Sequence, residues 1–304
     1  MSNINPRIDI AFKKLFGVEE NKDLLIALIN SIVGPEDQVS DVILLNPYNP
    51  QNFKEEKLSI LDIKATSLDG KRFNIEIQIS DEADYDKRAL YYWAKIYTEQ
   101  LKTSEDYSNL SKAIGIHILN FTSIPESKEY HNVFHIAEKN TGLVYFKDLE
   151  LHTLELKKFS SNSSDNLSDI VKKITKSLDI WLAFLTRNEL LIADNLPKEL
   201  DDKHLKKALK VLEIMNFSNQ ERDIYEDHLK WLRIEANTLK KAEEKGIEKG
   251  LAKGLEEGIQ KGKAEGQLES KLEIAKNLIA KGFDEKTILE ITGLSLQEIK
   301  QYFN

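Results

Sequence analysis

The stretch from Ile60 to Gln78 constrains the fold of this chain most, because its alternation of apolar and polar residues permits only one pairing of two strands. Alternation on both sides of a turn around Gly70 predicts a hairpin of two half-buried strands. A two-residue turn would place Asp62 opposite Ile77 and would mix polar with apolar residues on each face. A three-residue turn, with Gly70 in the left-handed conformation, places Asp62 opposite Glu76 and keeps the faces separate. The sequence therefore predicts the second register.

Two opposed carboxylates on this hairpin predict a metal site. The Cβ atoms of Asp62 and Glu76 would stand about 4.5–5.5 Å apart. At neutral pH the two carboxylates would repel each other unless a cation lay between them. Oxygen ligands from two strands suit Mg²⁺, with Mn²⁺ as the alternative. Gln78 points to the same face, where its amide can orient a water molecule.

The motif formed by Asp62, Glu76 and Gln78 is D…ExQ on a hairpin. It resembles the PD-(D/E)XK nuclease signature in the variant carried by the Rpn family of recombination-promoting nucleases, which are also described as transposases. The resemblance covers residues 1–120 and includes positions on both sides of the hairpin: Asp9, Phe12, Lys13, Phe16, Arg88, Tyr91, Tyr92 and Gln100. It implies a restriction-endonuclease-like α/β core, in which a mixed sheet is flanked by helices, and a metal-dependent activity on DNA. It also implies that Asp9 contacts the metal through water, although Asp9 equally fits a helix N-cap.

The identity of an activating lysine stays open, because this family has Gln where the wider superfamily has its catalytic Lys. Lys64 is our candidate, since it follows Asp62 by two residues on the same face and lies opposite Asn74. The alternative is that Lys64 is solvated or paired with a carboxylate. In the helix after the hairpin, Arg88 and either Tyr91 or Tyr92 could face the site, where Arg88 could hold a phosphate.

The acidic balance of the chain, a net charge of −8, disfavours a protein whose main work is to coat nucleic acid. A nuclease needs only a local basic rim. The sequence offers candidates for such a rim around the predicted site: Lys13, Lys14, Lys64, Arg72, Lys87 and Arg88.

The absence of cysteine excludes disulfides and thiolate metal sites and fits a cytoplasmic protein. The apolar runs are far shorter than the roughly 18 residues that a bilayer helix requires. The N-terminus also lacks the apolar core of a signal peptide. We therefore expect a cytoplasmic protein without a membrane segment.

The rest of the N-terminal half predicts further helices and strands. We expect helices at 9–16, 22–33 and 82–103, and strands at 42–45, 113–121, 143–146 and 151–159. His117 lies in the second of these strands and is interpreted as a core histidine. His131 and His135 have helical spacing, but their surroundings are β-like and lack the Glu of a zinc-peptidase motif, so no zinc site is predicted there.

The C-terminal half is helical in pattern, and glycine recurs in it every four residues from Gly246 to Gly266. Each interior glycine costs a helix up to about 1 kcal/mol relative to alanine, so we expect the helix to associate into a homo-oligomer. A flexible linker is the alternative. The tail has a helix-turn-helix outline. Its last helix offers little for phosphate contacts, so a small assembly module is preferred.

The expected organisation follows from these patterns. It comprises a nuclease-like core (1–160), a helical region packing on it (161–240), the glycine-repeat segment (241–269) and the tail module (270–304).

Two functional hypotheses follow. The first is a magnesium-dependent DNA endonuclease in which Asp62, Glu76 and the carbonyl of Ile77 hold the metal and Gln78 orients the attacking water. The second is an oligomeric nucleic-acid-binding or regulatory protein with a relict, weak or inactive nuclease core. The retention of Asp62, Glu76 and Gln78 together favours the enzyme. Nothing in the sequence separates cutting from strand transfer.

Overall fold

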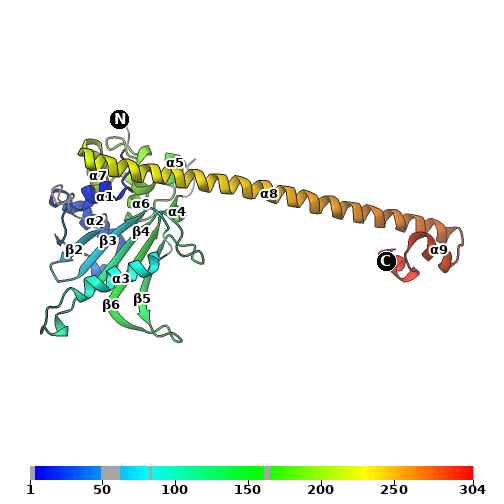
Figure 1. Cartoon of the computed structure of the whole chain (residues 1–304), viewed down its shortest axis with the longest axis horizontal. Coiled ribbons are helices and arrows are strands. Elements are labelled where there is room, and N and C mark those ends of the chain that lie inside the picture. Colours follow the sequence, from blue (N-terminus) through cyan, green and yellow to red (C-terminus); the bar gives the residue numbers. More distant parts are fainter. Residues whose placement is uncertain (1–3, 49–61, 82–83, 161–164, 304) are drawn as a thin grey trace. The chain divides into compact units, whose positions relative to one another are not determined.

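The computed structural model describes residues 4–48, 62–81, 84–160 and 165–303. Its centre is a mixed sheet with the strand order β1-β2-β3-β4-β6-β5 (Figure 1). The strands are β1 (Val42–Leu44), β2 (Ile63–Ser67), β3 (Arg72–Gln78), β4 (Ala113–Leu119), β5 (His131–Ala137) and β6 (Val144–Glu155). β4 runs parallel to both β3 and β6, while the other neighbouring strands are antiparallel.

The β2–β3 hairpin has the register that the alternation predicts. Lys64 pairs with Asn74, and the Ser67 amide donates to the Lys71 carbonyl at 2.9 Å. Gly70 closes the turn with φ +89°, the left-handed conformation expected of it. The ladder begins at Ile63, so its continuation by one residue brings Asp62 level with Glu76. The first residues of the predicted strand, Ile60 and Leu61, lie outside the described residues.

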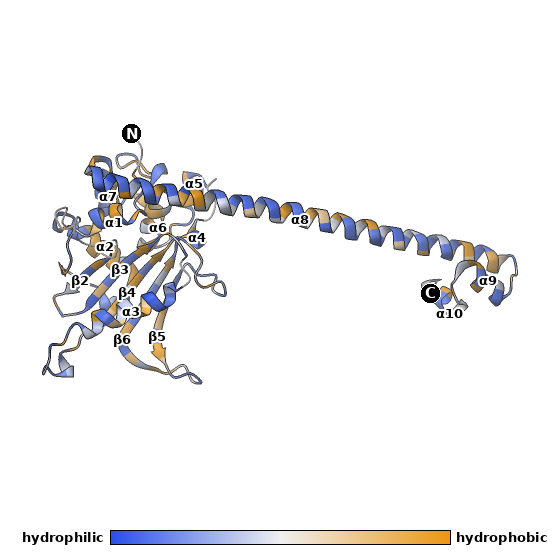
Figure 2. Ribbon diagram, viewed as in Figure 1, coloured by the Kyte–Doolittle hydropathy of each residue, from blue (hydrophilic) through white to orange (hydrophobic). Residues whose placement is uncertain are grey.

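Period-two alternation sorts the side chains of the sheet onto two faces. On one face Ile63, Ile75 and Ile116 belong to the main core, which the helices before β1 and after β6 complete. On the other face lies α3 (Tyr85–Thr98), whose Trp93 and Ile96 pack on Ala113. Figure 2 shows the hydrophobic residues concentrated on the strands between these layers. Asp62, Glu76 and Gln78 lie on the α3 face.

The remaining helices of this part are α1 (Asp9–Phe16), α2 (Lys22–Ile32), α4 (Leu156–Phe159), α5 (Leu167–Val171), α6 (Ser177–Arg187) and α7 (Lys203–Ile214). Single 3₁₀ turns join several of them: Glu19–Asn21, Pro35–Asp37, Tyr107–Asn109, Asn188–Leu190 and Lys198–Leu200. Buried residues of α5, α6 and α7, including Ile170, Leu182 and Leu205, belong to the main core. The helical region after the sheet is therefore part of that core.

Three expectations about these elements were wrong in detail. The two strands expected at 143–146 and 151–159 are one strand, β6, which ends in the short helix α4. Long-range pairing with both β4 and β5 decides this, and no local pattern reports it. The helix expected at 82–103 is the shorter α3. Ile8, not Asp9, is the N-cap of α1.

The structure divides into two compact units, residues 1–232 and 233–304. Helix α8 (Asn219–Ala280) begins in the first unit, where Tyr225 is buried with Ile8 and Ile79. In the second unit α8 contains the whole glycine repeat, and Figure 2 shows mostly hydrophilic residues along it. The end of α8 packs on α9 (Glu285–Thr292) and α10 (Leu296–Phe303) around Ala275, Ile288 and Ile299. No helix within the described ranges is both long and apolar enough to cross a membrane.

Candidate active site

Asp62 lies just before β2, in a half-buried position. Burial raises the pKa of its carboxyl group, and the positive charges of Lys64 and Lys13 oppose that shift. Asn46 Nδ2 lies 3.3 Å from Asp62 Oδ1 and 3.1 Å from its carbonyl oxygen, while Asn46 Oδ1 accepts from the Lys64 amide at 2.7 Å. Asn46 thus fixes the entry to β2. No motif or spacing in the sequence singles out Asn46 as part of the site.

Lys13 reaches the same point from α1. Its side chain is 1% exposed, and its Nζ donates to the Asp62 carbonyl at 2.5 Å. Burial lowers the pKa of Lys13 to about 8, with Asp62 acting to raise it and Lys64 to lower it. Lys13 therefore combines an anchoring contact with a positive charge beside the carboxylate.

Glu76 and Gln78 are joined by Arg88, which α3 places over this end of β3. Arg88 Nη2 donates to Glu76 Oε1 at 3.2 Å and to Gln78 Oε1 at 2.6 Å. The Gln78 amide in turn donates to the Ser80 carbonyl at 3.1 Å. The guanidinium also lies 5.3 Å from the ring centre of Tyr85. These contacts hold both side chains in defined orientations.

His117 is the neighbour of Glu76 on β4 and is fully buried. Its Nδ1 lies 2.5 Å from the Tyr85 hydroxyl and 3.8 Å from Glu76 Oε2. Burial, and then the charge of Arg88, lower the pKa of His117 to about 4, so the ring is neutral at neutral pH. The expected core histidine is thus also a neighbour of the site, which only the β3–β4 pairing could reveal.

The other predicted site residues differ in position. Lys64 lies on β2 opposite Asn74, as expected. Asp9 lies one turn before Lys13 on α1, and its Oδ2 is 3.9 Å from His228 Nδ1 on α8. Ile77 points its side chain into the main core, so only its carbonyl could serve the site. Tyr91 is 62% exposed and stacks edge-on against Tyr92, away from the contacts described above.

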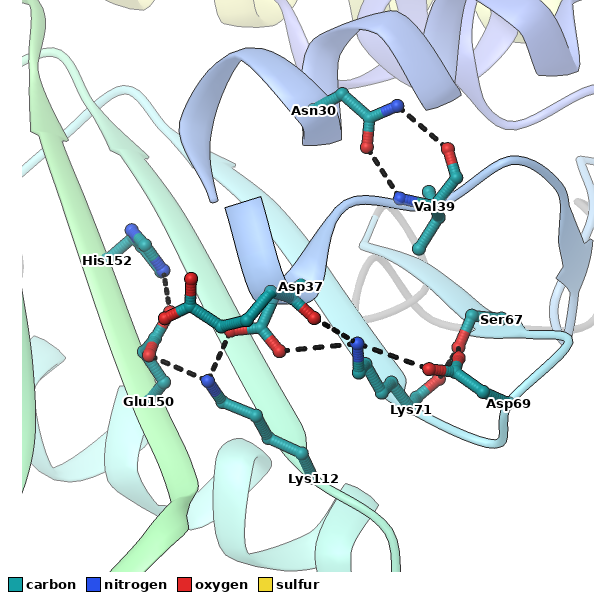
Figure 3. Close-up of polar contacts among 10 residues, drawn as sticks. Asn30, Asp37, Val39, Ser67, Asp69, Lys71, Lys112, Glu150 and His152 are labelled. Atoms are coloured by element: carbon teal, nitrogen blue, oxygen red, sulfur yellow. Dashed lines mark hydrogen bonds and ion pairs between the residues drawn. The ribbon is translucent and has the colours of Figure 1, made fainter. Parts of the chain in front are cut away.

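A second polar cluster lies on the opposite face of the sheet, and Figure 3 shows how its charges alternate. Lys112 Nζ contacts Asp37 and lies 2.8 Å from Glu150 Oε2. Lys71 joins Asp37 at 3.4 Å, and His152 Nε2 lies 2.7 Å from Glu150 Oε1. Burial alone would raise the pKa of Glu150, but its contacts with His152 and Lys112 lower it to about 2. We call these residues the paired network.

The two histidines for which no zinc site is predicted lie beside the paired network. His131 and His135 lie on β5, and His131 stacks on His152, with 2.9 Å between His131 Nε2 and His152 Nδ1. Within the described part of the chain, no group of three or more His, Asp or Glu residues could hold a metal ion.

A divalent metal nevertheless fits the donor set at Asp62 and Glu76. Magnesium commonly takes one or two carboxylates and completes its shell with water and phosphate oxygens, so two carboxylates suffice. Asp62 is half-buried, and it forms no ion pair within 4 Å with any residue of the described ranges, so a cation would offset its partial desolvation. Asp62, Glu76 and the carbonyl of Ile77 are the atoms that would hold it.

A mixed sheet flanked by helices, with an acidic residue at the same level of two adjacent strands, defines a nuclease-like core of the restriction-endonuclease type. The model of the family described as "PD-(D/E)XK nuclease family transposase" matches residues 6–242, and the chain belongs to that family. Residues 268–304 match a second description, "Rpn/YhgA-like nuclease family, C-terminal HTH domain". No curated protein and no solved structure gives a significant match.

The second match confirms the helix-turn-helix outline of the tail. The sequence analysis noticed the helix-turn-helix outline but preferred an assembly module, because the last helix is poor in basic residues. The match identifies this segment as a helix-turn-helix domain. In the structure, α9 ends at Gly293 with φ +68° and Ser295 forms reciprocal contacts with Glu298 at the start of α10. These contacts are those of a tight turn between two helices.

Proposed function

We propose that this protein is a metal-dependent DNA endonuclease that uses Mg²⁺, with Mn²⁺ as a substitute. The observation that carries the proposal is that Asp62 and Glu76 lie opposite each other on adjacent strands. Lys13 on α1 contacts the first of these residues, and Arg88 on α3 contacts the second. Membership of a nuclease family supports it. When bound, the metal would supply an activated water and neutralise charge on the phosphate.

The side chains around the metal would have separate roles in the reaction. Gln78, held by Arg88, would orient the attacking water through its amide. Arg88 would stabilise the charge that develops on the scissile phosphate. Lys64 and Lys13 both act on the carboxyl group of Asp62, and either could supply the charge that the superfamily lysine provides. Asp9, on the same face of α1 as Lys13, would contact the metal through water.

A plasmid-nicking assay with Mg²⁺, Mn²⁺ and EDTA tests this proposal. Asp62→Asn and Glu76→Gln should each lower the cleavage rate by about 10³-fold, since several kcal/mol of charge stabilisation would be lost. Asp106→Asn, at an exposed aspartate, is the matched control and should cleave like the wild type. Joined products in the same assay would report strand transfer. Equal activity of the wild type and Asp62→Asn, or no cleavage by the wild type with either metal, would contradict the proposal and favour a relict core.

We also propose that α8 assembles the protein into a homo-oligomer, whether or not the core cleaves DNA. Each of four glycines in α8 is followed by an apolar residue that is more than half exposed: Ile247, Leu251, Leu255 and Ile259. A Cβ atom added at any glycine of the repeat would meet no described atom within 4 Å, so within one chain these glycines are not needed for close packing. Close approach of a second helix would explain both features.

Sedimentation analysis of the full-length protein tests the assembly. The double variant Gly254→Leu/Gly258→Leu should dissociate more readily, although leucine favours the helix more than glycine does. A wild-type monomer at micromolar concentration, or tighter association of the double variant, would count against an interface at the glycines.

A further inference from the structure

A cavity of about 140 Å³ lies next to the candidate active site, between the sheet and the end of α3. Its polar lining comes from Lys64 on β2, Arg72 on β3, and Glu99 and Gln100 after α3. Lys64 and Arg72 lie on the α3 face of the sheet, the face that also presents Asp62 and Glu76. The cavity is therefore on the same surface as the two carboxylates.

The two cationic side chains of the cavity have no neutralising partner among the described residues. Within the described ranges, neither Lys64 nor Arg72 forms an ion pair within 4 Å. Arg72 Nε is moreover buried without a hydrogen-bond partner among these residues. A buried donor left unsatisfied costs about 1–3 kcal/mol, so an acceptor supplied by a ligand would offset that cost.

The other polar residues of the cavity are already engaged. Glu99 Oε1 lies 3.7 Å from Lys95 Nζ. Gln100 donates to the Ser111 carbonyl at 3.0 Å and accepts from the Ser111 amide at 2.9 Å, so its amide is used on both sides. Gln100 is thus held in one orientation by Ser111. Among the polar side chains of the cavity, Lys64 and Arg72 are therefore the ones that could bind a ligand.

We propose that this cavity binds a phosphate group of the DNA strand beside the one that is cleaved. This inference rests on the proposed nuclease function. Arginine presents a planar fork of donors that matches a phosphate, and lysine adds a second charge. Backbone phosphates are the main contacts by which proteins set the register of DNA.

The distances along the strands agree with this arrangement. Lys64 is two residues from Asp62, about 7 Å along β2, and Arg72 is four residues from Glu76, about 14 Å along β3. A DNA strand laid along this face, with one phosphate at the carboxylates, would bring its following phosphates to Lys64 and then Arg72. Lys64 lies between the two subsites and contributes to both.

Binding of a fluorescent oligonucleotide in EDTA tests the subsite without cleavage. Arg72→Gln should weaken binding by about five- to tenfold, and the slope of log affinity against log salt should fall by roughly 0.7–0.9, the loss of one phosphate contact. Arg222→Gln removes the same charge from an exposed position on α8 and should bind like the wild type. Arg72→Lys should restore the salt slope, because it restores the charge. A single cooperative urea transition of each variant, with the wild-type dependence on urea concentration, checks that the hairpin is intact.

The outcomes separate this subsite from the nuclease proposal. If the wild type binds DNA and Arg72→Gln binds it equally well, the subsite is wrong and the nuclease proposal stands. If the wild type binds neither single-stranded nor duplex DNA, both are wrong. Inorganic phosphate at constant ionic strength is the second probe. If phosphate stabilises the wild type against heating but not Arg72→Gln, and the two proteins bind DNA equally well, the cavity is a site for free phosphate. That result would overturn the assignment to DNA.

Discussion

The two faces of the central sheet carry polar clusters built from the same kinds of residue but paired differently. In the paired network, Lys112 lies between Asp37 and Glu150, and Lys71 also contacts Asp37. On the α3 face, Asp62 forms no ion pair within the described residues, although Lys13, Lys64 and Arg88 surround the site. One cluster neutralises itself, whereas the other pairs Arg88 with Glu76 but leaves Asp62 without an ion pair among the described residues.

The pKa values of Glu150 and Asp62 are shifted in opposite directions, in agreement with this difference. His152 and Lys112 lower the pKa of Glu150 to about 2 despite its burial. Burial raises the pKa of Asp62, because its positive neighbours do not outweigh the loss of solvent. A self-paired cluster is suited to holding strands together, and an incompletely paired one is suited to receiving a cation and phosphates. Four predictions test this contrast, ordered from the largest expected effect to the smallest.

Glu150→Gln should destabilise the protein by about 3–5 kcal/mol, because it removes the buried carboxylate that pairs with both Lys112 and His152. Urea unfolding at neutral pH measures the effect. Asp148→Asn, an exposed change two residues earlier on β6, is the matched control and should lie within about 0.5 kcal/mol of the wild type. A loss below about 1 kcal/mol in Glu150→Gln would show that the network contributes little to stability.

Gly70→Val should cost about 1–3 kcal/mol, because a branched residue is strained at φ +89°. Its Cβ would also meet Ser111 Oγ at 2.7 Å. The turn holds both clusters in place, since Lys71 follows it directly and the register of Asp62 depends on it. Gly70→Asn should cost less, because asparagine tolerates the left-handed region. Equal unfolding free energies for both variants and the wild type would contradict this role of the turn.

Asp62→Asn should raise the free energy of unfolding in EDTA by up to about 1 kcal/mol at neutral pH. The pKa of Asp62 is raised in the folded protein, so the folded state disfavours the carboxylate, and its burial is a net cost above the ordinary pKa of 3.8. The amide removes that cost and keeps the oxygen that accepts from Asn46. Destabilisation by more than about 1 kcal/mol would mean that Asp62 is compensated within the protein after all.

His131→Asn should flatten part of the pH dependence of stability. Burial, with the neighbouring His152 and Lys176, lowers the pKa of His131 from 6.5 to about 4. The unfolded chain therefore binds this proton at a higher pH than the folded one, so stability falls as the pH drops from 6.5 towards 4. His117 acts in the same window, and Glu150 acts lower, from 4.5 to about 2. Urea midpoints across this range measure the slope, and an unchanged slope in His131→Asn would refute the assignment.

Much of the fold followed from local pattern. Alternation and turn chemistry predicted the β2–β3 register and the left-handed Gly70, because both depend on residues close in sequence. The helical character of the second half was equally predictable. The extent of β6 was not, because its long pairing with β4 and β5 overrides a local pattern that suggests two strands. The helix-turn-helix outline of the tail was also visible in its sequence, because it depends on a turn between two short helices.

The sequence by itself determined which carboxylates share a face, since a period of two leaves no freedom once the turn length is known. Only the tertiary structure decided which distant side chains meet them. Lys13 comes from α1 and Arg88 from α3, and neither spacing nor composition reports where a helix packs on a sheet. The pairing of β3 with β4 places His117 beside Glu76, and the end of α3 leaves Lys64 and Arg72 facing a cavity. Whether a charge is paired or left for a ligand depends on contacts between residues far apart in the chain, and these exist only after the core has formed.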